Sequence, residues 1–412
     1  MDQERRYEST LVAILFFTWG TVFLDRTSQH YLAPYFVPEF HLSTQQVGLL
    51  GSAVAVTWAV STLVFGALSD RVGRKPILVP VVFLFSMLSW ISGITHNFQQ
   101  LLLVRALLGI AEGPAWSIMT ALIEESSPPS RRGRNIGMVV SAAALVGLAA
   151  APVLTTQVAA RVGWRWAFFV SGVPGFVLGV LIWKFVKEPE RRNVPSAHGQ
   201  AVKVQDFLSV LRYRNMWLCC AGAAGFVSWL FLHQIFAPLY ITQAAHQAPT
   251  TAGFLMGASG LGSFFFALYF PGLSDKWGRR PVLLLMAVMI AVVPLALLIS
   301  PLYSYPWLLA VIVCLTNAGQ GIAALILVLV PTESVPPQFA ATAIGLATLS
   351  AEILGATVAP VLAGRVAESQ GLGATLWMSA GGAALLFVVA LLLKETYRVR
   401  EGHGAVKEAV AN

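Results

Sequence analysis

One short segment of this chain occurs twice, half a chain apart. The sequence Gly66-Ala-Leu-Ser-Asp-Arg-Val-Gly-Arg-Lys-Pro76 returns 205 positions later as Pro271-Gly-Leu-Ser-Asp-Lys-Trp-Gly-Arg-Arg-Pro281. Each copy is a polar, basic island between two long apolar runs. Because both the loops and the apolar blocks repeat, we infer that a whole membrane-embedded half was duplicated, which predicts two similar halves around a central axis.

The repeat extends beyond these loops and divides the chain. Ala151-Pro-Val-Leu154 matches Ala359-Pro-Val-Leu362 at an offset of 208, and Ala33-Pro34 matches Ala237-Pro238 at 204. The segment after the first half is rich in Pro, Arg, Ser and Gly, as expected of an exposed linker. The predicted N-terminal half, cytoplasmic linker, C-terminal half and cytoplasmic tail are residues 1–188, 189–207, 208–396 and 397–412.

The composition indicates a protein that crosses the membrane many times. Hydrophobic residues make up 57% of the chain and charged residues 11%, against about a quarter charged in soluble domains. Apolar stretches long enough to cross a bilayer recur, and each must be a helix to satisfy its backbone in lipid. We predict an all-α fold of twelve transmembrane helices in two pseudo-symmetric six-helix bundles, at about 9–36, 45–69, 76–95, 98–124, 134–158, 165–187, 215–243, 250–273, 281–300, 305–331, 340–364 and 373–394.

The net charge of +8 reflects the orientation of the chain in the membrane and does not indicate a nucleic-acid partner. With both termini inside, 22 of the 27 Lys and Arg residues fall on the inner side, whereas only Arg161, Arg165 and Arg365 fall outside. This positive-inside asymmetry predicts an N-in, C-in topology in a cell membrane, which in a bacterium is the inner membrane.

No feature of the sequence points to catalysis or to a bound metal. Cys219, Cys220 and Cys314 lie inside predicted spans without metal-ligand spacing. No nucleotide-binding loop or nucleophile–base pair stands out at a meaningful spacing. We therefore expect no enzyme activity, no metal and no cofactor, and a chain that acts as a monomer.

The doubled loop carries a resemblance to a known family. Gly-x-Leu-x-Asp-Arg-x-Gly-Arg-Lys between spans two and three, echoed between spans eight and nine, resembles the signature loop of the major facilitator superfamily. The second copy has Pro271 where the leading glycine usually stands. The resemblance implies two bundles around a central cavity that alternate between outward-open and inward-open states.

The loop charges also predict a gate on the inner side. Asp70 and Asp275 lie at inner ends of spans, where each can accept hydrogen bonds from a helix N-terminus in the other half. Arg74 is expected to bridge to Glu124 or Glu125 at the inner end of span four. The alternative is that these charges only fix orientation. The predicted gating residues are Asp70, Arg71, Arg74, Glu125, Asp275 and Arg279.

Span one contains an adjacent acid and base. The apolar run Thr10–Leu24 is fifteen residues, short of the twenty or so needed to cross. The span is therefore expected to continue past Asp25 and Arg26, with Gln29 and His30 one turn away, all facing the cavity. In the alternative, a short span ends at Asp25 and leaves the pair at the outer surface.

Span four contains a second pair. Arg105 and Glu112 are seven residues apart, two turns along one helix face. A carboxyl at the centre of a span is either paired with a cation or protonated, which makes Glu112 a candidate proton carrier. The alternative is a static ion pair of Glu112 with Arg105 or Arg26. At an offset of 208 the counterpart of Glu112 is Gln320, which cannot titrate.

These pairs extend the resemblance to one branch of the superfamily. The Asp-Arg pair, the run Arg-x-x-x-Gly-x-x-Glu-Gly-Pro from Arg105 to Pro114, and Trp164-Arg-Trp-Ala-Phe168 resemble the anion:cation symporters. The resemblance implies that Arg26 grips a substrate carboxylate while Asp25 and Glu112 couple a proton. Phe23 stands where this branch usually has tyrosine, which favours an apolar or aromatic carboxylate over a polyhydroxy acid.

Polar candidates in the second half are fewer. Glu352 is predicted either as a second proton site or as a partner of His233, and the sequence leaves both open. Together with the first-half residues, the predicted substrate-binding set is Arg26, Gln29, His30, Arg105, His233, Gln234, Asn317 and Gln320, and the predicted proton-coupling set is Asp25, Glu112 and Glu352.

The favoured function is proton-coupled symport of a small organic anion, with the anion, the proton and the bilayer as partners. The alternative is a proton-coupled antiporter that exports hydrophobic compounds. Arg26 and Arg105 favour an anion over a cationic drug, because each would repel a cation within the membrane.

Overall fold

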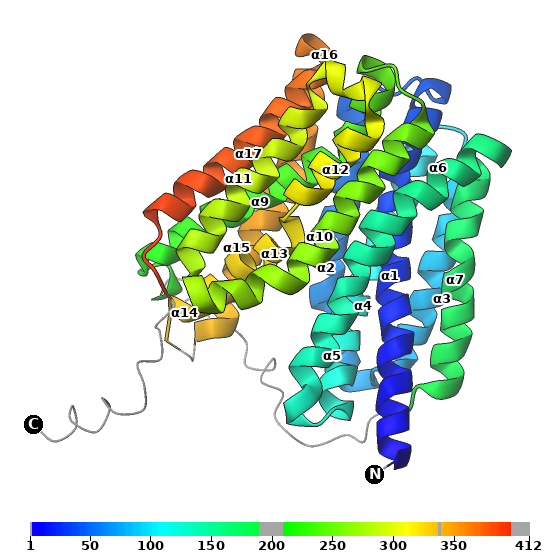
Figure 1. Ribbon diagram of the computed structural model, residues 1–412. Coiled ribbons are helices and arrows are strands. Elements are labelled where there is room, and N and C mark those ends of the chain that lie inside the picture. Colours follow the sequence, from blue (N-terminus) through cyan, green and yellow to red (C-terminus); the bar gives the residue numbers. More distant parts are fainter. Residues whose placement is uncertain (1, 189–208, 337–338, 397–412) are drawn as a thin grey trace, which may run out of the picture.

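The computed structural model describes residues 2–188, 209–336 and 339–396, and these ranges contain helices and turns but no strand (Figure 1). The predicted linker 189–207 and tail 397–412 lie outside the described residues. Eleven helical segments are long and apolar enough to cross a membrane by length and composition. The remaining predicted span, 45–69, falls within a helix of 29 residues. Each of the twelve predicted spans therefore coincides with a helical segment, and the one at 305–331 is interrupted at Asn317 and Ala318.

The first half is built from six spans, and the fifth of them contains a π-helical segment. In chain order they are α1 (Asp2–Glu39), α2 (Thr44–Val72), α3 (Lys75–Gly93), α4 (Phe98–Ser126), α5 (Pro129–Ala142) with η1 (Ala143–Ala150) and α6 (Ala151–Val162), and α7 (Trp164–Phe185).

The second half repeats this order, with span ten broken in its middle. Its elements are α9 (Arg214–Leu239) with η2 (Tyr240–Ala244), α10 (Pro249–Trp277), α11 (Arg279–Leu297), η3 (Ser300–Ser304), α12 (Pro306–Thr316), α13 (Gly319–Ala323) with η4 (Ala324–Leu329) and α14 (Val330–Glu333), α15 (Ala340–Ser350) with η6 (Ala351–Val358) and α16 (Ala359–Gln370), and α17 (Gly373–Leu392).

The duplication is visible in local backbone geometry. Gly73 ends α2 with φ +119° and Gly278 ends α10 with φ +95°, a left-handed region that glycine enters without strain. The π-helical segments η1 and η6, at 143–150 and 351–358, are separated by the repeat offset of 208. The pattern of apolar residues did not predict them, because a π-helical segment keeps the apolar composition of the α-helix around it.

The two halves meet at their outer ends through close backbone contacts. A Cβ atom added at Gly48 of α2 would collide with the carbonyl oxygen of Pro360 in α16, and one added at Gly253 of α10 would lie 2.6 Å from the carbonyl oxygen of Pro152 in α6. Gly48 and Gly253 are related by the offset of 205, and Pro152 and Pro360 by 208. The same glycine–carbonyl contact therefore occurs twice, once on each side of the interface.

Hydrogen bonds and apolar packing reinforce this outer contact. The hydroxyl of Thr44 donates to the carbonyl of Gly364 at 2.7 Å, and the hydroxyl of Ser52 donates to the carbonyl of Thr357 at 2.7 Å. One buried apolar cluster includes residues of both halves, among them Phe36 and Ile235. The outer ends of the two bundles are thus closed against each other.

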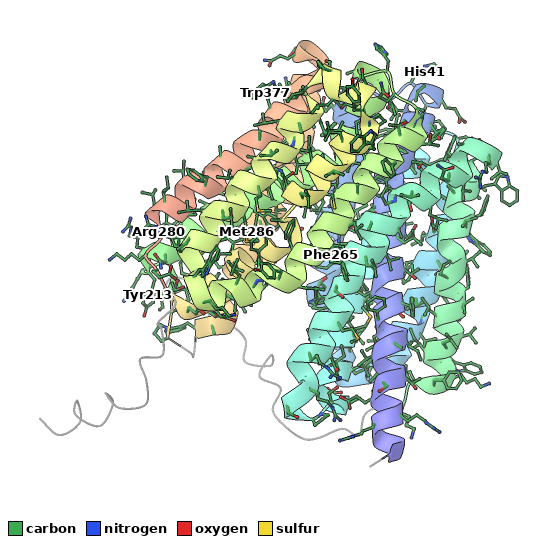
Figure 2. All side chains as sticks on the ribbon, viewed as in Figure 1. His41, Tyr213, Phe265, Arg280, Met286 and Trp377 are labelled. Atoms are coloured by element: carbon green, nitrogen blue, oxygen red, sulfur yellow. The ribbon has the colours of Figure 1, made fainter. Side chains whose placement is uncertain are left out.

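At the inner ends, the described polar contacts join elements of the same half. Arg74 pairs with Glu125 at 3.2 Å within the first half, and Arg279 pairs with Glu333 at 2.7 Å within the second. In Figure 1 the bundles converge at the top and diverge towards α5 and α14 at the bottom. Figure 2 places His41 at the top of the molecule and Arg280 at its left edge, near the start of α11. The two halves are therefore packed together at their outer ends, whereas the described inner ion pairs stay within each half.

Substitution of Gly48 by alanine is expected to shift the protein away from this outer-closed state, because the added methyl group cannot fit against the Pro360 carbonyl. Spin labels at the exposed outer residues His41 and Gln370 should show a longer distance distribution by electron resonance. The control is Gly345→Ala, since an added Cβ there has nothing within 4 Å. An unchanged distance in Gly48→Ala would contradict the role given to this contact.

Candidate functional site

Span one continues through its charged pair, so the alternative of a short span that ends at Asp25 is wrong. Helix α1 runs unbroken to Glu39, and Asp25 is 0% exposed. Arg26 follows directly and is partly exposed. Since consecutive helical residues point about 100° apart, one helix directs the carboxyl into the first bundle and the guanidinium towards the second.

Arg26 lies between aromatic rings from the two halves. Its guanidinium carbon is 5.2 Å from the ring centre of Trp58 on α2 and 5.9 Å from that of Phe231 on α9. Such cation–π contacts hold a guanidinium while leaving its N–H donors free for an anion. The arginine that the sequence assigned to substrate therefore lies at the boundary between the bundles.

A buried charged cluster lies beside it in the first bundle. Asp25, Arg105 and Glu112 are each 0% exposed and interact electrostatically with one another. Among the described residues, the side-chain nitrogen and oxygen atoms of Arg105 and Glu112 have no hydrogen-bond partner, and the polar neighbour of the Asp25 carboxyl is the hydroxyl of Ser89. The predicted alternative of a static ion pair of Glu112 with Arg105 or Arg26 is therefore wrong for this state.

Packing holds this cluster in place. The Arg105 guanidinium carbon lies 4.8 Å from the ring centre of Phe168 on α7. Gly109 and Gly113 bring α4 against α2, where an added Cβ at Gly113 would lie 2.7 Å from the Trp58 carbonyl oxygen. Buried groups that lack partners are costly, so the surrounding helices must hold them. Such a cluster can exchange a proton or an ion partner without first breaking a strong pair.

The remaining first-half candidates lie one turn further out. Gln29 is 2% exposed, and its Oε1 atom is unpartnered among the described residues. His30 is 6% exposed and lies beside α2, where an added Cβ at Gly51 would be 3.6 Å from its Cε1 atom. His30 also interacts electrostatically with Arg26 and Arg105. The structure thus brings the predicted first-half residues together around α1.

The second half places its candidates in two groups. His233 and Asn317 are buried and joined through Ser259, at the break of span ten. Glu352 is partly exposed and interacts electrostatically with Arg26. The predicted pairing of Glu352 with His233 is therefore not found in the described residues, and Glu352 instead extends the charged region of the first half.

Gln234 and Gln320 border these two groups. Gln234 is 9% exposed. Gln320 is partly exposed, and its backbone N–H donates to the hydroxyl of Ser263 at 3.1 Å. The uncharged counterpart of Glu112 therefore lies next to the break in span ten.

The predicted gating residues make contacts within each half. Arg74 reaches Glu125, as predicted, and Arg279 forms the equivalent bridge to Glu333. Asp275 pairs with Arg279 of its own half at 2.6 Å. The predicted hydrogen bonds of Asp275 with a helix N-terminus in the other half are not among the described contacts. The side chain of Asp70 lies outside the described residues. Arg71 is on α2, at the same inner end.

Two further inner carboxylates were missed from the sequence. Glu188 accepts the backbone N–H groups of Arg74 and Lys75, both at 2.7 Å, and so caps α3. Glu395 accepts those of Arg279 and Arg280 at 2.8 and 3.0 Å. The two acids are 207 residues apart, close to the repeat offset, and this spacing is the signal that would have found them.

Comparison with known families agrees with this architecture. The model of the Major Facilitator Superfamily matches residues 15–356. The chain belongs to this superfamily. The fold, its eleven helices long and apolar enough to cross a membrane, and the doubled loop agree with this family.

Several curated relatives are bacterial transporters. The chain is 28% identical over 277 residues to the probable L-galactonate transporter of Escherichia coli K12, covering 62% of this chain and 60% of that protein. It is 29% identical over 353 residues to the cis,cis-muconate transport protein of Acinetobacter baylyi, covering 81% and 82%. The match to the first of these thus spans less than two thirds of the relative's length.

Solved structures show the same fold. A bacterial homologue of the human lysosomal transporter Spinster, in an inward-facing, unoccupied conformation, aligns with a TM-score of 0.73 at 20% identity, covering 93% of this chain and 97% of that one. The nucleoside transporter NupG aligns with a TM-score of 0.76 at 13% identity, covering 93% and 100%.

Glu112→Gln is expected to leave the fold intact and to raise its unfolding temperature by a few degrees. A neutral amide costs less to bury without partners than a carboxylate does, and removing such functional strain commonly stabilises a protein. Thermal unfolding in detergent measures the shift. Glu124→Gln, at an exposed carboxylate of the same helix, should leave it unchanged. A large fall for Glu112→Gln would show that this carboxyl has a structural partner.

Proposed function

We propose that this protein takes up a small organic carboxylate together with a proton. The observation that carries the proposal is the set of buried ionisable groups Asp25, Arg105 and Glu112, of which Arg105 and Glu112 have no hydrogen-bond partner, beside the aromatic-held Arg26. Charges within a membrane are costly and are retained where they bind ions or substrates. This set combines cations that suit a carboxylate with carboxyls that suit a proton.

Relatives support the choice of anion. They include the probable L-galactonate transporter, the cis,cis-muconate transport protein and a 3-(3-hydroxy-phenyl)propionate transporter of Escherichia coli K12, the last at 27% identity over 79% of this chain. Each named compound is an organic acid. The aromatic rings of Trp58 and Phe231 around Arg26 favour unsaturated or aromatic acids over polyhydroxy acids, which agrees with Phe23 in place of a tyrosine.

In the proposed cycle the proton controls how firmly the anion is held. Protonation of Asp25 or Glu112 removes a negative charge near Arg26 and Arg105, which strengthens their attraction for the substrate carboxylate. Loss of the proton to the inside restores that charge and weakens the attraction. The size of this coupling is limited by the difference in anion affinity between the two protonation states.

The gates supply alternating access to this site. The glycine–carbonyl contacts at Gly48 and Gly253 close the outer end. At the inner end, the bridges Arg74–Glu125 and Arg279–Glu333 hold the loop charges within each half. In the outward-open state we propose that Asp70 and Asp275 turn to the opposite half and close the inner end.

Arg26→Ala is expected to reduce carboxylate uptake at least about tenfold, because a charge-assisted hydrogen bond to a carboxylate contributes about 1.5–3 kcal/mol. Counterflow in proteoliposomes, screened with aromatic acids, short dicarboxylates and sugar acids at pH 5.5 and 7.5, measures the loss. Arg161→Ala, at an exposed arginine of the outer side, is the matched control. Full uptake of every acid by Arg26→Ala would refute Arg26 as the carboxylate site. A wild type that carries none of these acids would refute an anion carrier and favour the export of uncharged or cationic compounds.

Glu112→Gln is expected to separate exchange from accumulation. Without a titratable group at this position, an acid already inside can still exchange by counterflow, whereas an inward proton gradient no longer drives accumulation. The measurement compares counterflow with gradient-driven uptake, with and without a protonophore. Accumulation at the wild-type level by Glu112→Gln would exclude this carboxyl as the coupling site.

A further inference from the structure

Span ten is interrupted in its middle, and polar side chains gather at the interruption. Helix α12 ends at Thr316 and α13 begins at Gly319. Asn317 at the break is 5% exposed, and Ser259 of α10 and His233 of α9 beside it are each 2% exposed. Broken helices inside a transporter bundle commonly border the substrate, since their freed backbone groups need polar partners.

The hydrogen bonds at this break have a defined direction. The Oδ1 atom of Asn317 accepts the backbone N–H of Gly319 at 3.0 Å, which fixes the orientation of the amide. Its Nδ2 atom therefore donates to the hydroxyl oxygen of Ser259 at 2.6 Å. Ser259 is left with its own hydrogen to donate, and the Nε2 atom of His233 lies 3.4 Å away.

This direction favours one tautomer of His233, because no other acceptor for the Ser259 hydrogen is found among the described residues. A neutral imidazole has one donor nitrogen and one acceptor nitrogen. With Nε2 accepting from Ser259, the hydrogen is on Nδ1. Among the described residues Nδ1 has no hydrogen-bond partner. The ring stacks on Trp229, with centres 5.8 Å apart and planes 7° apart, and the Trp229 indole N–H is held by the carbonyl of Ile290 at 2.9 Å.

The repeat places this donor level with the first-half site. At the offset of 204, His233 corresponds to Gln29, whose Oε1 atom is also buried and unpartnered. Gln29 lies one turn beyond Arg26 on α1. Helix α9 likewise contributes Phe231 to the Arg26 site. The two halves therefore present unpartnered polar atoms at the same depth of the fold.

We propose that the Nδ1–H of His233, held by Ser259 and Asn317, donates to a second oxygen of the substrate, at the end remote from Arg26. The substrate class is then a carboxylate that also carries a distal carboxylate, hydroxyl or carbonyl oxygen. This inference rests on the proposed carriage of carboxylates by Arg26, and it adds the second-half group that selects among them.

The test uses pairs of acids that share a carbon skeleton and differ in the distal oxygen group: trans,trans-muconate against sorbate, and 3-(3-hydroxyphenyl)propionate against 3-phenylpropionate. Inhibition constants are measured in a counterflow assay with an acid that the wild type carries. The wild type should bind the oxygen-bearing member of at least one pair about tenfold more tightly. Equal binding within both pairs would overturn the inference.

Two substitutions of His233 separate binding from folding. The amide nitrogen of Asn can take the place of Nδ1, whereas that of Gln reaches towards Nε2. His233→Asn should therefore keep most of the preference and His233→Gln should lose it. Ser259→Ala, which frees the other tautomer, should weaken the preference two- to fivefold. A structural role for His233 would instead lower the binding of both members of a pair equally.

Comparison of Arg26→Ala with His233→Gln distinguishes a failure of this inference from a failure of the proposed function. If Arg26→Ala leaves binding of all four acids intact, the carboxylate site itself is wrong. If Arg26→Ala abolishes their binding while His233→Gln keeps the wild-type ratio within each pair, the carboxylate site stands and the role of His233 is refuted. Melting temperatures of the variants, measured alongside, exclude misfolding as the cause of a lost ratio.

Discussion

The fold depends on the close approach of two backbones at the outer interface. Gly48 lies against the carbonyl of Pro360 and Gly253 against that of Pro152, and neither contact leaves room for a side chain. These contacts allow the hydroxyls of Thr44 and Ser52 to reach backbone carbonyls of the opposite half. They also allow one apolar cluster to draw residues from both bundles. The orientation of Arg26 between Trp58 and Phe231 follows from this closure, because its two aromatic partners belong to different halves.

The closed outer end covers a cluster of buried charged residues beside Arg26. Asp25, Arg105 and Glu112 are fully buried, yet neither Arg105 nor Glu112 has a hydrogen-bond partner among the described residues. A structural ion pair would have stabilised the bundle in one arrangement. Groups left without partners instead respond to any ion that arrives, which suits a protein that must bind and release its cargo in every cycle.

The sequence predicted the fold because the repeat, the apolar spans and the positive-inside bias each constrain the same topology. It also predicted that Asp25 is embedded, since Thr10–Leu24 is too short to cross alone. It did not predict Trp58 and Phe231 as neighbours of Arg26, because contacts between halves depend on which state the bundles adopt. Ser259 was missed for a related reason: a lone serine in an apolar span has no pattern, and only the break at Asn317 gives it a role.

The π-helical segments η1 and η6 change which residues of spans five and eleven share a helix face. Each lies directly before the proline of the outer contact, Pro152 or Pro360. A π-helical turn takes up more residues than an α-helical one, so the outer part of each span is out of phase with the inner part. A helical wheel drawn over either whole span would assign Pro152 or Pro360 to the wrong face, and scanning mutagenesis of these spans needs two separate wheels, one on each side of the π-helical segment.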